Sequence, residues 1–107
     1  MTNESYIVVI IATSTKEEAE KIGKILVEEK LAASANIIPS INSFFFWKGE
    51  FKNISEAILL VNTRGALFGK LKERAHELHS YELPEVIALP ILAGSSEFLD
   101  WIKENTQ

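Results

Sequence analysis

ASANIIPSINSFFFWKGEFKNISEAILLV, residues 33–61, decides the fold of this chain. Two strand-like runs meet at Lys48-Gly49, and a two-residue connection with a glycine free to adopt φ > 0 is typical of a β-hairpin. The first run, residues 33–47, is about three times the usual strand length of roughly 5–6 residues. At about 3.3 Å per residue it would reach about 50 Å. No helix of a chain of 107 residues can cover a hairpin of that length.

Large aromatic side chains gather at the expected hairpin tip. The alternation of apolar and polar residues stops at Phe44, residues 44–47 put large apolar groups on both faces, and Phe51 follows across the turn. These five residues are half of the six Phe, two Tyr and two Trp in the chain. Because a monomer rarely exposes such a patch, we expect other copies of the chain to bury it.

The pairing of the two hairpin strands is expected to contain one irregularity. A two-residue turn would set Ile41 opposite Glu56, whereas one extra residue on the second strand would pair Ile41 with Ala57. A slip of one residue moves every later side chain to the other face of the sheet. We therefore predict a β-bulge within residues 52–55 or a break at Pro39.

Length and composition favour one ordinary globular domain spanning residues 1–107. The chain is 47% hydrophobic and 24% charged, and its net charge of −4 with no cluster of Lys or Arg argues against a nucleic-acid partner. It has no cysteine, which excludes disulfides and thiolate metal sites. No signal peptide or membrane-spanning apolar run is present, so we expect a cytoplasmic protein without a membrane partner.

The remaining elements follow from apolar periodicity. Residues 6–12 are β-branched and apolar on both faces, which predicts a central strand. The sequence STKE at residues 14–17 has the pattern of a capping box, in which Ser14 and Glu17 would start a helix that runs to about Lys30. The elements expected after the hairpin are a helix over residues 66–78, a strand over residues 86–92 and a short helix carrying Phe98, Leu99 and Ile102.

This order is βαββαβ followed by a C-terminal helix. Right-handed crossovers place both crossover helices on one face of a four-stranded antiparallel sheet, which is a ferredoxin-like α+β sandwich. The other face of the sheet then lies bare. Because residues 6–12 are apolar on both sides, that face needs a cover, which again favours self-association.

The segment from His76 to Glu85 holds most of the side chains capable of chemistry. Both histidines and several carboxylates lie here, and imidazole with carboxylate oxygen suits Cu(II) or Zn(II). The alternative interpretation is that His79 lies at the C-terminus of a helix, where it interacts with the helix dipole, while His76 is simply solvated. No nucleophile elbow, P-loop or dinucleotide motif exists, so we expect a protein that is not an enzyme. Acid–base work by Glu82 or Glu85 stays an alternative.

Four motifs resemble the CutA family of divalent-cation tolerance proteins: LAASANIIP at 31–39, SFFFWKG at 43–49, LHSYELPE at 78–85 and FLDWI at 98–102. W-K-G followed by H-x-Y-E-x-P-E at this spacing is specific, and the likeness covers nearly the whole chain. The resemblance implies a ferredoxin-like fold and a tight homotrimer whose long hairpins are exchanged between subunits, as in PII-like trimers. It also implies a role in the response to copper and other divalent cations.

The resemblance further implies a metal site at His79, with Glu82 or a carboxylate of another subunit as a second ligand. Ser80 stands where the family usually has proline, and Ser34 where cysteine is common, so copper cannot bind through a thiolate here. We expect no required cofactor, and weak binding of Cu(II) or another divalent cation. The residues expected in a cleft or trimer interface are Phe44, Phe45, Phe46, Trp47, Lys48, Tyr81 and Glu85.

A second class of function stays open beside metal tolerance. A PII-like signalling or scaffold trimer would bind a small anion or a protein partner at the clefts between its subunits. The aromatic residues 44–47 resemble a base-stacking platform, but without basic residues they are expected to pack against protein.

Overall fold

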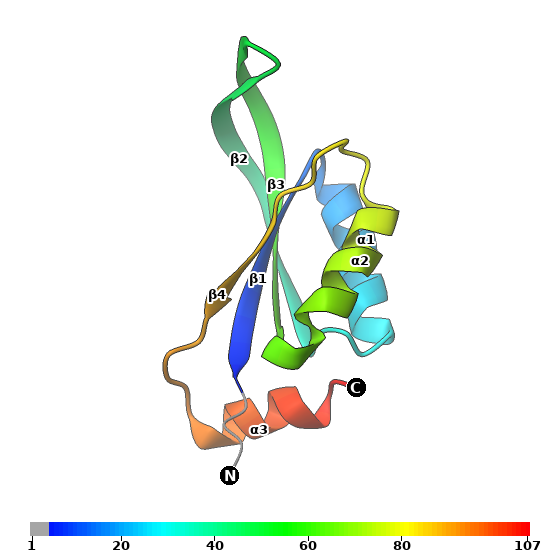
Figure 1. The fold of residues 1–107 in the computed structure, drawn as a ribbon, viewed down its shortest axis with the longest axis vertical. Coiled ribbons are helices and arrows are strands. Elements are labelled where there is room, and N and C mark those ends of the chain that lie inside the picture. The colour runs from blue at the N-terminus through cyan, green and yellow to red at the C-terminus, as the bar shows by residue number, and fades with distance from the viewer. Residues whose placement is uncertain (1–4) are drawn as a thin grey trace.

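The computed structural model describes residues 5–107, which form one four-stranded antiparallel sheet with three helices (Figure 1). The sheet order is β2-β3-β1-β4, the order of a βαββαβ ferredoxin-like sandwich, so the predicted fold class is confirmed. The elements are β1 (Tyr6–Thr13), α1 (Lys16–Glu28), β2 (Ser34–Trp47), β3 (Glu50–Arg64), the 3₁₀ turn η1 (Gly65–Leu67), α2 (Phe68–Leu78), β4 (Val86–Pro90) and α3 (Ser96–Glu104).

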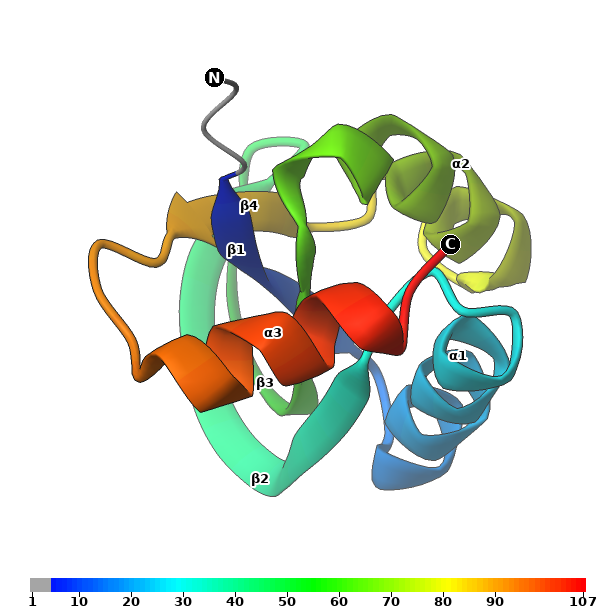
Figure 2. The same ribbon diagram turned by 90° about the horizontal axis from the view of Figure 1, so that it is seen from below.

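The hydrophobic core lies between the sheet and the pair α1 and α2. Ile22 and Leu26, four residues apart on α1, face the sheet together with Leu71 of α2 and are fully buried. They pack in one cluster with the inward side chains of the central strands, such as Val9 and Leu59. Helix α3 lies across the end of the sheet farthest from the hairpin tip (Figures 1 and 2).

The opposite face of the sheet keeps an apolar surface. Val8 and Ile10 of β1 are only half-buried, in alternation with their buried neighbours. Across the ladder, Val8 pairs with Leu89 and Ile10 with Ile87, and both β4 residues are exposed. Strand β1 is therefore apolar on both faces as predicted, while only one face is covered by α1 and α2.

Helix α1 begins one residue later than the sequence pattern predicted. Thr15 is the N-cap, and its Oγ1 accepts the N–H of Glu18 at 3.1 Å. Glu18 Oε1 in turn accepts the N–H of Ser14 at 3.1 Å. The arrangement resembles a capping box made by Thr15 and Glu18 instead of Ser14 and Glu17, except that Glu18 accepts the N–H of Ser14, one residue before the N-cap.

The ladder between β2 and β3 shifts by one residue at Pro39. Residues 39–40 of β2 oppose the single residue Ala57 of β3, so the predicted break at Pro39 is confirmed. The alternative bulge within residues 52–55 is wrong, since the ladder there is regular and Ile41 pairs with Glu56. Proline carries no N–H for the ladder, which explains why the irregularity lies on β2.

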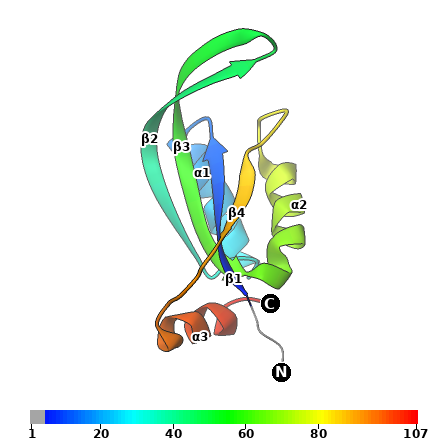
Figure 3. The same ribbon diagram turned by 60° about the vertical axis from the view of Figure 1, so that its left-hand side comes forward.

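The outer hairpin protrudes from the rest of the chain. Its turn is made by Lys48 and Gly49, with φ of 50° and 81°. The radius of gyration of 14.5 Å exceeds the roughly 13 Å of a compact domain of this size, and the longest extent is 49 Å. Figure 3 shows the hairpin bending so that its tip leans over the end of β1 and the start of β4.

Candidate functional site

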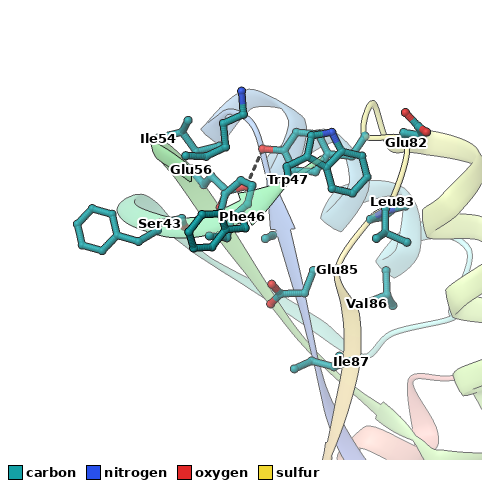
Figure 4. A pocket seen from close by; sticks show the side chains of 16 residues that line it. Ser43, Phe46, Trp47, Ile54, Glu56, Glu82, Leu83, Glu85, Val86 and Ile87 are labelled. Carbon is teal, nitrogen blue, oxygen red and sulfur yellow. Dashed lines mark hydrogen bonds between the residues drawn. The ribbon is translucent and has the colours of Figure 1, made fainter. Parts of the chain in front are cut away.

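The bent hairpin and the segment before β4 enclose a cleft of about 930 Å³. One wall is the aromatic end of the hairpin and the other is residues 81–87 (Figure 4), and Ala12 of β1 also lines the cleft. The volume lies within the range of roughly 300–1,000 Å³ that is usual for small-molecule sites. The cleft contains most of the residues that the sequence singled out.

A buried carboxylate lies in the cleft and is bound by a tyrosine. Glu56 of β3 is 7% exposed, and Tyr81 Oη donates a hydrogen bond to its Oε2 at 2.6 Å. Burial raises the pKa of the Tyr81 phenol, and the hydrogen bond to Glu56 and the negative charges of Glu56 and Glu18 raise it further. Tyr81 therefore stays protonated and remains a donor across the physiological range.

His79 is held by hydrogen bonds at both ring nitrogens. Nε2 lies 2.6 Å from the carbonyl oxygen of Ala12, and Nδ1 lies 3.0 Å from the backbone nitrogen of Tyr81. A carbonyl can only accept and an amide N–H can only donate, so Nε2 carries the proton and Nδ1 supplies its lone pair. The imidazole in this arrangement has no free lone pair for a metal ion.

Glu82, the second predicted metal ligand, lies at the rim of the cleft. Its Oε1 is 3.4 Å from Lys48 Nζ, and both side chains are largely exposed. Within residues 5–107 no group of three or more His, Asp or Glu side chains could hold a metal ion together. A metal ion at His79 would have to displace Ala12 or Tyr81 from the ring, and the metal site stays a prediction.

The predicted aromatic residues divide between the two faces of the hairpin. Phe44 and Phe46 both contact Phe51, with ring centroids 6.1 and 5.7 Å apart. Phe46 and Phe51 are 73% and 61% exposed, so this ring cluster has no cover in a single chain. Trp47 lies near the rim of the cleft, where Lys48 Nζ is 5.5 Å from its ring centroid.

Two further site residues escaped the sequence analysis. Glu56 lies at the start of an apolar run and looked like an ordinary strand residue, although a charged residue beside Ala57 was the available signal. Glu18, in the first turn of α1, was given no role from the sequence, yet its Oε2 accepts the N–H of Ser80 at 2.8 Å. Burial raises the pKa of Glu18, but hydrogen bonds from Ser80 and Ser14 outweigh it, and the net pKa is lowered.

Comparisons with known proteins agree with this architecture. The family model described as CutA1 divalent ion tolerance protein matches residues 7–105. The divalent-cation tolerance protein CutA of Thermus thermophilus is 50% identical over 99 residues, which are 92% of this chain and 96% of that protein. The chloroplastic protein CutA of Arabidopsis thaliana is 42% identical over 101 residues, 94% of this chain and 56% of that protein.

Solved structures show the same fold. The CutA1 structure from Thermus thermophilus aligns with a TM-score of 0.92 at 48% identity, over 95% of this chain and 99% of that chain. The CutA structure from Archaeoglobus fulgidus, which is described as periplasmic, also has a TM-score of 0.92, at 40% identity over 95% and 99% of the two chains. None of the helices within residues 5–107 is both long and apolar enough to cross a membrane. The chain belongs to the CutA1 divalent ion tolerance family.

Proposed function

We propose that this chain is a cytoplasmic homotrimer that acts in the response to divalent cations as a binding protein and not as an enzyme. The single observation that carries the proposal is the uncovered ring cluster of Phe44, Phe46 and Phe51 at the end of a hairpin that protrudes from its own domain. Contact with a second and a third copy would remove these rings and the bare face of the sheet from water. Membership of the CutA1 family supports the link to divalent cations.

In this proposal Cu(II) or another divalent cation binds weakly through His79 and Glu82. Imidazole nitrogen and carboxylate oxygen are suitable ligands for Cu(II). The ring must first give up a hydrogen bond to Ala12 or Tyr81, which costs about 0.5–1.5 kcal/mol for each bond. That cost, together with the small number of ligands, explains why we expect weak rather than tight binding.

The test is isothermal titration of Cu(II) into the wild-type protein and three variants. His79→Ala and Glu82→Gln should each weaken binding by about tenfold or more, whereas His76→Ala, which removes an exposed imidazole three residues away on α2, should leave binding unchanged. Equal affinity in wild type, His79→Ala and Glu82→Gln would reject the site. Circular dichroism of each variant establishes that it is folded.

A second candidate function is favoured by the cleft itself. A PII-like signalling or scaffold protein would bind a small ligand or a protein partner there, and a cleft of about 930 Å³ with aromatic walls supports this alternative. A ligand that binds the folded protein raises its melting temperature. Metabolite-dependent thermal shifts in metal-free buffer would favour this candidate over metal tolerance.

A further inference from the structure

We propose that the cleft binds an aliphatic polyamine, with one ammonium group at Glu56 and another between Trp47 and Glu82. This inference goes beyond the proposed role in divalent-cation tolerance. It uses the same cleft but requires neither a bound metal ion nor His79.

The inner end is the buried carboxylate of Glu56. Tyr81 donates one hydrogen bond to Oε2, and no other residue within 5–107 donates to either oxygen. A carboxylate has about four acceptor positions, and a buried one is stabilised when they are filled by donors. An ammonium group supplies three N–H donors and the opposite charge, so it can fill the acceptor positions of the Glu56 carboxylate that Tyr81 leaves open.

The outer end already holds an ammonium group of this chain. Lys48 Nζ lies 5.5 Å from the ring centroid of Trp47 and 3.4 Å from Glu82 Oε1. Aromatic faces attract alkylammonium ions, and a nearby carboxylate adds a charged hydrogen-bond acceptor. The Lys48 and Glu82 side chains are 67% and 72% exposed, and an exposed ion pair contributes little to stability, so a ligand ammonium can take the place of Lys48.

Charge and shape together select the class of ligand. Glu56, Glu82 and Glu85 line the cleft together with Lys52, which is paired with Glu50 at 3.0 Å, and Lys48 lies at the outer end. The lining is therefore net negative and disfavours anions such as nucleotides. Figure 4 shows Glu85 extending from the β4 side toward the hairpin.

Between the acidic groups the lining is apolar. Phe45 and Trp47 of the hairpin, together with Leu83 and Val86, provide surface for methylene groups. The carboxylates do not form a three-residue metal cluster, so several separated positive charges on a flexible chain fit better than one compact ion. A linear polyamine combines separated ammonium groups with methylene spacers.

The test is calorimetric titration of spermidine, with neutral 1,6-hexanediol as the control ligand, in metal-free buffer of low ionic strength. Spermidine should bind saturably and hexanediol should not. Glu56→Gln should weaken spermidine binding by about tenfold or more, because a charged hydrogen bond is lost. Glu104→Gln makes the same change of charge on α3, at the other end of the molecule, and should have no effect.

Two other variants decide the matter if Glu56→Gln does not fold. Glu85→Gln should weaken spermidine binding, and Lys48→Ala should strengthen it several-fold by removing the competing ammonium. No saturable binding, or equal affinity in all variants, would overturn the inference. The molar mass of the ligand-free protein separates this inference from the proposed trimer. A trimer that does not bind spermidine would contradict only the polyamine site. A monomer that binds spermidine would contradict only the trimer.

Discussion

Tyr81 Oη lies 2.6 Å from Oε2 of Glu56, and this hydrogen bond ties the segment that follows α2 to the long strand β3. The two residues are 25 positions apart in the sequence. The bond fixes one wall of the cleft against the carboxylate within it. Loss of the donor would leave a largely buried carboxylate with fewer partners than before.

Tyr81→Phe should therefore lower the free energy of unfolding by about 1–3 kcal/mol, the usual cost when a buried polar group loses its partner. Urea denaturation measures the change. Tyr6→Phe removes the same hydroxyl group from β1, where the structure gives that hydroxyl no hydrogen bond to the described residues, and should have a much smaller effect. Equal losses in the two variants would show that the bond to Glu56 adds nothing to stability.

His79→Ala should also destabilise the protein, by about 1–3 kcal/mol. The substitution leaves the buried Ala12 carbonyl and the Tyr81 N–H without their shared partner. Thermal unfolding in metal-free buffer measures this structural effect separately from any metal. His76→Ala on the exposed side of α2 is the matched control, and we expect it to change stability by less than about 0.5 kcal/mol.

Gly23→Ala should destabilise the protein although alanine is the better helix former. A Cβ at Gly23 would lie 2.9 Å from Leu59 Cδ1 and 3.1 Å from Ala35 Cβ. Leu59 is fully buried, which leaves its side chain little room to shift, so overpacking of about 1–3 kcal/mol outweighs a gain in helix propensity of up to about 1 kcal/mol.

Gly69→Ala is the control for this substitution. A Cβ at Gly69 of α2 would meet nothing within 4 Å. We expect a small stabilisation of up to about 1 kcal/mol there, because only the propensity difference acts. Denaturant unfolding of the two variants should give changes of opposite sign, and stabilisation by both would contradict the close packing of α1 on the sheet.

Acid sensitivity should depend in part on the ion pair between α1 and α2. Arg74 donates to both carboxylate oxygens of Glu29 at 2.9 Å, and these hydrogen bonds lower the pKa of Glu29 below its ordinary value of 4.5. A lowered folded-state pKa stabilises the protein above the ordinary value, and the contribution disappears as the pH falls through the lowered pKa.

Arg74→Met should consequently lower the melting temperature slightly at pH 7, and the difference from wild type should close as the pH falls well below 4.5. Lys72→Met, on an exposed position of the same helix, should show no such convergence. A difference in melting temperature between wild type and Arg74→Met that stays constant from pH 7 to pH 3 would contradict the stabilising role of the Arg74–Glu29 ion pair.

The sequence predicted those features that depend on local pattern. Alternation and helical periodicity gave the order of the elements, and the proline at position 39 gave one of the two places proposed for the break in the hairpin. The role of Glu56 could not be predicted, because its burial depends on how the segment around Tyr81 returns to β3. The hydrogen bonding of His79 could not be predicted either, because its Nε2 bonds the carbonyl of Ala12, which is 67 residues away in the sequence.

The most direct test of the proposed trimer is the molar mass of the protein by light scattering in dilute solution. We predict a single species of three times the chain mass of 12.0 kDa, with the Phe44, Phe46 and Phe51 rings buried between copies. A stable, well-behaved particle of 12.0 kDa at the same concentration would contradict the trimer.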